Sequence, residues 1–264
     1  MSKIIGIAGE INSGKDVVAN MIRYLIARKN DKRDIDILTA EFLGLTENNW
    51  VAINARQPFI IKRFADKVKD IICIILNCTR KDLENRKFKE KELPEKWWYY
   101  QIEYNQIMYT TLEEATAENI KLMKLYNVKS DIKVVKLTPR KMMQLIGTKC
   151  GRNIIHPNIW VNTITDEYDN SKYKNWIIPD VRFKNEAQSI LDRNGIIIKV
   201  NRPCTKCNEY ENVNCKDDYH LKDKDESETS LIDFKFDYII NNDKDITELM
   251  KNVKNILIKE QLLF

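Results

Sequence analysis

The sequence lacks three features that would narrow its function at once. It has no apolar run approaching the about 18 residues of a membrane-spanning helix, so we expect no membrane partner. Its first residues lead directly into a short apolar run, so we expect no signal peptide. It also lacks a strong excess of one charge, because 44 Lys and Arg against 39 Asp and Glu leave a net charge of +5. That balance suits a polyanionic small molecule as well as nucleic acid. We therefore expect a cytoplasmic protein.

Cysteine is scarce, and the predicted location favours reduced thiols over disulfides for the six cysteines. Three of them and one histidine nevertheless follow the spacing C-x2-C-x7-C-x4-H, at Cys204, Cys207, Cys215 and His220. Two interpretations stay open for this segment, residues 203–227: a structural Zn²⁺ site, or a loop with free thiols. Four protein ligands leave no open coordination position, so a zinc ion here would be structural.

What the sequence does contain is a P-loop pattern close to its start. Residues 9–15 have the form G-x-x-x-x-G-K, between an apolar run at 4–8 and an amphipathic stretch at 17–27. This order predicts a buried strand, a phosphate-binding loop and a helix whose N-terminus faces the anion. A glycine-containing turn that binds no ligand is the alternative. The residues expected to hold the nucleotide are Gly9, Asn12, Ser13, Gly14, Lys15, Asp16 and Val17.

The P-loop departs from its usual form after the lysine. A Ser or Thr hydroxyl that ligates Mg²⁺ normally follows, whereas this chain has Asp16 and Val17. Ser13, Asp16, or a water bridged to Asp180 could replace that hydroxyl. We favour coordination through water, with Asp16 and Asp180 in the outer shell.

Strands and helices alternate along the chain, which predicts an α/β fold with a mostly parallel sheet. Residues 28–57 are polar and predict a connection with one short helix at 39–45. Residues 81–135 predict an inserted, mostly helical arm, in which the aromatic residues of 97–109 have helical spacing. The core then comprises 1–80 and 136–264, with a lid at about 138–158. Further strands are expected at 59–65, 176–180, 196–201 and 238–241. Further helices are expected at 66–76, 138–146, 159–168, 185–194 and 246–263.

Three stretches contain residues that could bind the acceptor of a phosphoryl transfer or act on the transferred phosphate. Lys69 and Asp70 follow the predicted strand at 59–65, where a helix begins. Arg140 opens a basic helix that is a candidate lid, because guanidinium groups suit bidentate phosphate contacts. Asp180 ends an apolar strand, and Arg182 follows two residues later, facing the same cleft. Two roles stay open for Asp180: it acts on Mg²⁺ through water, or it holds Arg182 in place. Ordinary solvated helix surfaces are the alternatives for the first two stretches.

These stretches together resemble the phage-type deoxynucleoside monophosphate kinases, over residues 1–80 and from about 137 onward. The motifs that carry the resemblance are Ser13-Gly14-Lys15-Asp16, Phe64-Ala65-Asp66 with Lys69, Thr138-Pro139-Arg140 through Gln144 with Gly147-Thr148, Gly151-Arg152-Asn153, and Asp180-Val181-Arg182-Phe183 with Asn185-Glu186. There are two departures: Val17 stands where the family usually has Thr, and 225–228 (DESE) stand where His-x-Ser-Glu is expected.

The resemblance implies a three-layer P-loop fold of the nucleoside-monophosphate-kinase type. It implies transfer of the γ-phosphoryl group of ATP to a deoxynucleoside 5′-monophosphate (dNMP), with Mg²⁺. Such kinases can be homodimers, and a viral member would act in the host cytoplasm. The implied catalytic residues are Lys15, Arg140, Asp180 and Arg182. The implied acceptor-site residues are Lys69, Asp70, Gln144, Gly147, Thr148, Trp160, Arg182 and Glu186.

Two other functions remain as alternatives. One is a P-loop kinase that acts on another small molecule, such as a coenzyme precursor. The other is a nucleotide-dependent nucleic-acid-binding protein, which would use the basic lid and a zinc knuckle. The modest net charge and the apolar surroundings of the tryptophans argue against nucleic acid.

Overall fold

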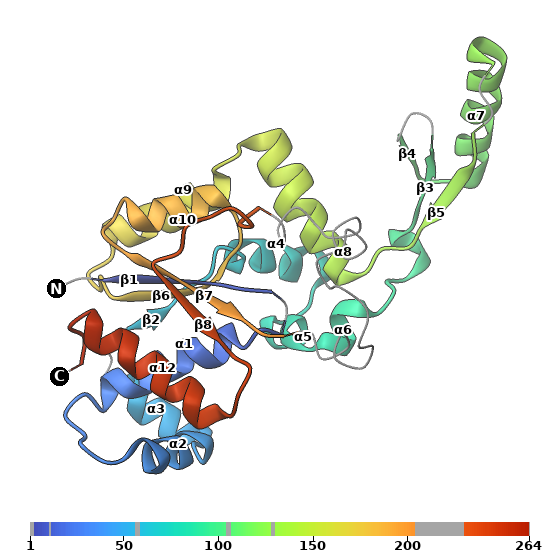
Figure 1. Ribbon diagram of the computed structural model, residues 1–264. Coiled ribbons are helices and arrows are strands. Elements are labelled where there is room, and N and C mark those ends of the chain that lie inside the picture. The colour runs from blue at the N-terminus through green and yellow to red at the C-terminus, as the bar shows by residue number, and fades with distance from the viewer. Residues whose placement is uncertain are drawn as a thin grey trace, which may run out of the picture. The chain divides into compact units, whose positions relative to one another are not determined.

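The computed structural model describes residues 3–10, 12–55, 59–103, 107–127, 130–203 and 230–263 (Figure 1). The chain divides into two compact units, one of residues 1–65 and 160–264 and one of residues 66–159. The second unit contains the predicted arm together with the helix before it and the predicted lid. The four candidate zinc ligands and residues 225–228 lie outside the described residues.

The first unit is built on a five-stranded sheet in the order β2-β6-β1-β7-β8, with every neighbouring pair parallel. Side chains alternate between its faces: Ile5 and Ile7 point to one apolar cluster, Ile4 and Ala8 to the other. Helices cover both faces, so the predicted three-layer α/β fold is confirmed (Figure 1). The strands are β1 (Ile4–Ala8), β2 (Ile60–Ile61), β6 (Trp176–Val181), β7 (Ile196–Asn201) and β8 (Tyr238–Asn241).

Among the described elements, four helices contribute to the apolar cluster on one face of the sheet and two contribute to the cluster on the opposite face. The first set is α1 (Lys15–Ala27), α2 (Ile35–Leu43), α3 (Glu47–Ala55) and α12 (Ile246–Lys259); the second is α9 (Ile159–Asn170) and α10 (Lys184–Leu191). Among the residues that the structure describes, no helix is long and apolar enough to cross a membrane.

The prediction of a polar connection at residues 28–57 is wrong, because α2 and α3 occupy most of it. The Asp34 side chain caps α2 by accepting a hydrogen bond from the N–H of Asp36 at 3.0 Å. Leu38 and Ile53 insert into the core, 1% and 6% exposed. Few apolar residues suffice to anchor these helices, so their hydrophobic periodicity is weak.

The second unit combines short helices with a small antiparallel sheet in the order β4-β3-β5. Its strands are β3 (Tyr99–Ile102), β4 (Met108–Tyr109) and β5 (Ile132–Val135). Its helices are α4 (Asp66–Leu76), α5 (Arg80–Glu84), α6 (Arg86–Glu90), α7 (Leu112–Tyr126), α8 (Pro139–Gln144), the 3₁₀ turn η1 (Glu95–Trp97) and the π-helical segment η2 (Leu145–Ile155).

Helical spacing of the aromatic residues at 97–109 was a misleading signal. Tyr99 and Tyr100 lie in β3, opposite Val135 and Val134 of β5. Aromatic and β-branched side chains favour such cross-strand pairs, and this preference prevails over the periodicity.

The predicted start of the lid helix is confirmed, but its predicted end is wrong. The Thr138 hydroxyl caps α8 by accepting from the N–H of Lys141 at 3.1 Å, and Pro139 is the first helical residue. The chain continues past Gly147 as η2 instead of stopping there. A Cβ added to Gly147 would meet only Val68, at 3.8 Å, so this glycine is compatible with a continuing helix. π-Helical turns are frequent at functional sites.

We expect Ile5→Ala to lower the free energy of unfolding by about 2–5 kcal/mol, because Ile5 is fully buried on the central strand. Urea denaturation measures the change. Ile239→Ala on β8 is the matched control: this side chain is 59% exposed, so we expect a change within about 0.5 kcal/mol. Equal effects of the two substitutions would contradict this placement of the core.

Candidate active site

The P-loop leads from β1 into the first turn of α1. Gly14 has φ of 98°, a left-handed conformation, and Lys15 begins the helix. The N–H of Ser13 donates to the carbonyl of Glu10 at 3.2 Å, which closes the loop. The Lys15 ammonium donates to the same carbonyl at 3.0 Å. The loop therefore has the predicted form, with its lysine at the start of a helix whose first N–H groups suit an anion.

Two glycines of the loop are required by close neighbours. A Cβ at Gly9 would lie 2.6 Å from both the Ser13 hydroxyl and the carbonyl of Val200, and one at Gly14 would lie 2.6 Å from Asn242 Nδ2. The Asn242 amide donates to the carbonyl of Ser13 at 2.9 Å. These approaches show that β7 and the residue after β8 shape the P-loop from outside it.

The Ser13 side chain stands out within the loop. It is 2% exposed, and its buried hydroxyl has no hydrogen-bond partner in the described parts of the chain. Leaving a buried hydroxyl unsatisfied is costly, so such a group is a candidate ligand-binding atom.

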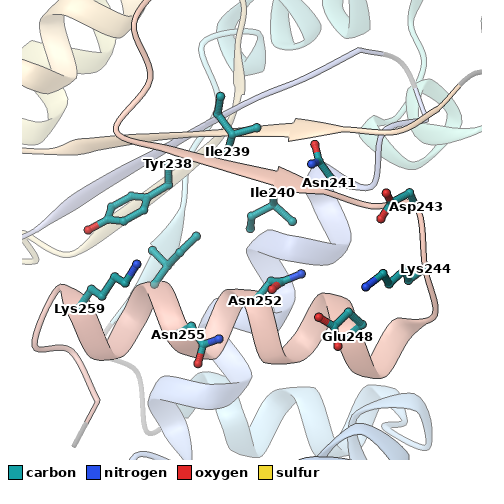
Figure 2. A pocket seen from close by; sticks show the side chains of 11 residues that line it. Tyr238, Ile239, Ile240, Asn241, Asp243, Lys244, Glu248, Asn252, Asn255 and Lys259 are labelled. Atoms are coloured by element: carbon teal, nitrogen blue, oxygen red, sulfur yellow. The ribbon is translucent and has the colours of Figure 1, made fainter.

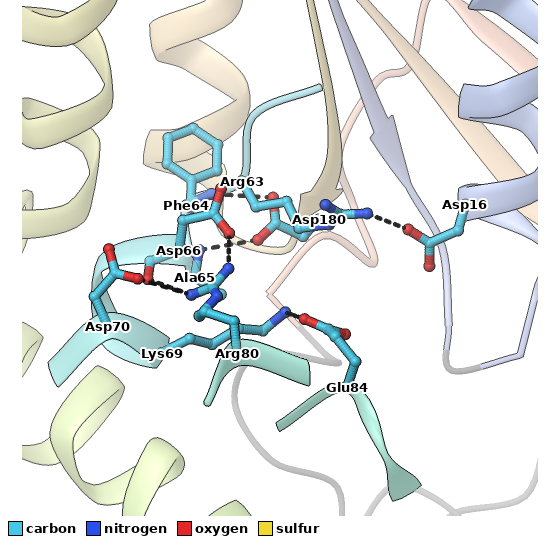
Figure 3. Close-up of polar contacts among 10 residues, drawn as sticks. All are labelled: Asp16, Arg63, Phe64, Ala65, Asp66, Lys69, Asp70, Arg80, Glu84 and Asp180. Atoms are coloured by element: carbon cyan, nitrogen blue, oxygen red, sulfur yellow. Dashed lines mark hydrogen bonds and ion pairs between the residues drawn. The ribbon is translucent and has the colours of Figure 1, made fainter. Parts of the chain in front are cut away.

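Asp180 joins the ends of two strands, as Figure 3 shows. Its Oδ1 accepts from the N–H of Phe64 at 3.1 Å and its Oδ2 from the N–H of Ala65 at 3.0 Å. Burial raises the pKa of the Asp180 carboxyl, while the two N–H donors and the charges of Arg182 and Arg63 act in the opposite direction. The carboxylate thus occupies the place predicted for it, at the carboxyl end of a parallel strand.

Arg63 connects the two carboxylates that we predicted near Mg²⁺. Its Nη2 lies 2.9 Å from Oδ1 of Asp16, and its charge also acts on Asp180 (Figure 3). Sequence reasoning did not select Arg63 as a site residue, although it precedes the Phe64-Ala65-Asp66 motif directly.

Glu186 holds the loop that carries Arg182. It is 2% exposed, and its Oε2 accepts from the N–H groups of Arg182 and Phe183 at 2.7 and 3.1 Å. These bonds give Glu186 a positioning role at the start of α10. Trp160, in the first turn of α9, is 6% exposed.

In the second unit, α5 supplies partners to the charged residues of α4 (Figure 3). Lys69 Nζ lies 2.6 Å from Glu84 Oε1. The Arg80 guanidinium donates to the Asp66 carbonyl at 2.7 Å, pairs with the Asp66 carboxylate, and lies 3.3 Å from Asp70 Oδ1. Both predicted acceptor residues of α4 are therefore engaged by α5.

The lid residue Arg140 pairs with Glu90 of α6. Burial lowers the pKa of Lys89, and the positive charges of Arg140 and Lys69 lower it further. The negative charges of Glu84 and Glu90 act in the opposite direction. Lys69, Lys89 and Arg140 thus form one cationic cluster within this unit. Sequence reasoning missed Lys89 because its charge-dense surroundings predicted only a solvated surface.

The remaining predicted acceptor residues of this unit lie on the lid. Gln144, exposed, ends α8, while Gly147 and Thr148 are half-buried in η2. The structure thus places them one after another on one continuous helical segment.

A groove of about 410 Å³ lies elsewhere in the first unit, between β8 and α12 (Figure 2). Its lining includes Tyr238, Asn241, Lys244, Glu248, Asn252 and Lys259. None of the predicted site residues lines it. The described residues contain no group of three or more His, Cys, Asp or Glu that could hold a metal ion.

A family model described as deoxynucleotide monophosphate kinase matches residues 3–253 of this chain. The chain belongs to the deoxynucleotide monophosphate kinase family. It is 26% identical over 213 residues to the deoxynucleoside-5′-monophosphate kinase of Escherichia phage T5, an alignment that covers 74% of each chain. It is 32% identical over 128 residues to an Acanthamoeba polyphaga mimivirus protein with the provisional name deoxynucleotide monophosphate kinase; these cover 44% of this chain and 59% of that protein.

Membership of the deoxynucleotide monophosphate kinase family confirms the predicted resemblance and the predicted enzyme class, a kinase. The family match spans both units, including the arm, where the motifs are weakest. The role of each side chain in this deoxynucleotide monophosphate kinase remains a prediction from its position.

We expect Asn242→Ala to raise the KM for ATP about fivefold, because one hydrogen bond to the P-loop backbone is worth about 1 kcal/mol. The KM for the monophosphate should stay unchanged. Steady-state kinetics with each substrate varied in turn provides the measurement. The exposed Asn255→Ala on α12 is the control; an equal rise in that variant would show that Asn242 has no special role.

Proposed function

We propose that this chain transfers the γ-phosphoryl group of ATP to the 5′-phosphate of a dNMP and releases the dNDP. The observation that carries the proposal is a P-loop at the start of α1 with a half-buried carboxylate, Asp180, near the end of the adjacent strand β6. In an open α/β sheet this edge binds the ligand. The family match supports the acceptor class.

For the donor, the loop N–H groups and the first turn of α1 would bind the ATP phosphates. Lys15 would exchange its bond to the Glu10 carbonyl for a phosphate oxygen. The unpartnered Ser13 hydroxyl could be satisfied by the same ligand. These residues act by positioning and by stabilising charge, which is most of what phosphoryl transfer needs from a protein.

The residues near Asp16 fit an Mg²⁺ ion that they contact through water. When bound, the ion neutralises charge on the phosphate oxygens. Asp180 has both oxygens bonded to N–H groups, yet a carboxylate oxygen can accept more than one hydrogen bond. Asp180 can therefore orient a water molecule while it keeps its bonds to the two N–H groups. Asp16 is two-thirds exposed and has one oxygen paired with Arg63.

For the acceptor, we propose that cations bind the monophosphate and that neighbouring polar groups select the nucleoside. In the first unit, Arg182 is the proposed phosphate ligand. In the second unit, Lys69 and Arg140 have this proposed role, and Lys89 adds to the positive potential there. Ion pairs with Glu84 and Glu90 hold two of these cations when no anion is bound. Asp70, Gln144, Gly147, Thr148 and Trp160 are proposed to contact the nucleoside, and Glu186 to position Arg182.

Three further features stay predictions. They are a homodimer, action in the host cytoplasm, and a structural zinc ion at the four Cys/His ligands. The viral origin of both relatives supports action in the host cytoplasm. Metal analysis of the purified protein tests the zinc ion.

An assay that couples ADP release to a visible signal, with ATP, Mg²⁺ and each dNMP in turn, tests the function. At least one dNMP should raise ADP release above background. We expect Arg182→Ala to lower kcat/KM for that dNMP by about 10²–10³, the loss typical of one charge-stabilising donor.

Arg193→Ala is the matched control, because Arg193 lies after the far end of α10, where it pairs with Asp169 at 2.6 Å and donates to the Ser189 carbonyl at 3.1 Å. Its kcat/KM should stay within twofold of that of the parent, because a surface ion pair contributes only about 0–1 kcal/mol. Unchanged kinetics of Arg182→Ala would remove Arg182 from the acceptor site.

We expect Val17→Thr to lower the Mg²⁺ concentration for half-maximal activity several-fold, since it adds a hydroxyl that can ligate the metal, one position after the usual Ser or Thr of a P-loop. Asp16→Asn should raise that concentration, because it removes a negative charge near the ion. Mg²⁺ titrations at saturating ATP measure both effects. Val51→Thr, at an exposed position of α3, is the control. If both variants titrate like the parent, the metal does not lie near this turn.

A further inference from the structure

Helix α4 ends in a reverse turn that brings two cysteines together. Asn77 has φ of 49°, in the left-handed region. The N–H of Cys78 donates to the carbonyl of Cys73 at 3.1 Å, and the N–H of Asn77 donates to the carbonyl of Ile74 at 3.4 Å. These bonds define a Schellman motif, in which the side chains at its two ends commonly contact each other. In α4 those two positions are Cys73 and Cys78.

Helix α12 ends in the same Schellman motif, so its two end positions can be compared with Cys73 and Cys78 of α4. Gln261 has φ of 56°, and the N–H of Leu262 donates to the carbonyl of Leu257 at 2.9 Å. Leu257 is fully buried, and Leu262 packs against the same core cluster. The two end positions thus hold an apolar pair in α12 and a pair of thiols in α4.

The two thiols are neighbours. Burial raises the pKa of the Cys78 thiol, and the adjacent Cys73 thiol raises it further. Both are half-buried and pack against one apolar cluster that contains Ile72, Leu83, Leu137 and Met142. The backbone bond between the two residues and their packing on one cluster place the side chains next to each other, as disulfide formation requires.

We propose that Cys73 and Cys78 form an oxidisable dithiol, a modification site for small disulfides such as oxidised glutathione. One cysteine thiolate attacks a sulfur of the oxidant and releases one glutathione thiol. The second cysteine then attacks the mixed disulfide and releases the other. Two protein thiols are oxidised to one disulfide, and the oxidant is reduced to two thiols that take up the two protons.

The modification would act on the proposed acceptor residues through Arg80. Arg80 follows Cys78 by two residues and connects α5 to Asp66 and Asp70 of α4 (Figure 3). A covalent bond would tighten the turn and shift Arg80. This consequence rests on the proposed function: oxidation should raise the KM for the dNMP several-fold and leave the KM for ATP unchanged.

Mass spectrometry of the full-length protein tests the bond itself. The protein is treated with oxidised glutathione, alkylated with iodoacetamide and digested with trypsin without reductant. Both cysteines fall in one tryptic peptide, residues 70–80, because Lys69 and Arg80 flank them. We expect this peptide to be two hydrogens lighter and free of alkyl groups, and dithiothreitol to reverse the change. Two alkyl groups or two glutathione adducts on it, with exposed Cys150 modified by glutathione, would overturn the proposal.

Single variants separate the bond from other oxidation. Cys73→Ala and Cys78→Ala should each retain a glutathione adduct on the remaining cysteine, and their KM for the dNMP should no longer respond to oxidation as the parent does. Cys150→Ala is the control and should respond like the parent. The mass readout needs no activity, so an inactive kinase would leave this result intact. A parent KM unaffected by a confirmed disulfide would refute the link through Arg80.

Discussion

The first unit depends on one half-buried carboxylate, Asp180, which accepts hydrogen bonds from two backbone N–H groups. The ladder between β2 and β6 has only two residue pairs, Ile60 with Trp176 and Ile61 with Ile177. Asp180 extends this short pairing with its side chain, since it holds Phe64 and Ala65 after the strand has ended. The desolvation of the carboxylate opposes its burial, and the two donors offset that cost. Arg63, and through it Asp16, take their places from this connection.

In the second unit, cations and acids on short helices balance each other. Lys69 and Arg140 each have an acidic partner, on α5 and α6 respectively, while Lys89 lies near both. Surface ion pairs of this kind contribute little to stability. The role that we propose for them is to hold long side chains in one orientation until a phosphate replaces the carboxylates.

Local patterns predicted those parts of the fold that local interactions determine. The strand, loop and helix at 4–27, the helix α4 and the Thr138-Pro139 start of α8 all follow from capping, glycine and periodicity. Patterns failed where tertiary contacts decide: Leu38 and Ile53 anchor helices with weak periodicity, and Tyr99 and Tyr100 pair across strands. The side chains missed at the site, Arg63, Lys89 and Asn242, have partners that no short motif contains. The sequence suggested Arg182 and Asp180 as site residues. It did not show that Glu186 holds the backbone of Arg182, or that Asp180 bonds to the backbone of Phe64 and Ala65.

The hydrogen bond from the Asn242 amide to the Ser13 carbonyl joins residues that are 229 positions apart in the sequence. A ribosome therefore synthesises the P-loop 229 residues before the side chain that supports it. Strands β7 and β8, and helix α12 packed on α1, must be made before the nucleotide cradle can close. Contacts of such large separation slow folding, because the chain loses much entropy before they form. The nascent protein thus carries its most recognisable motif long before that motif can bind a nucleotide.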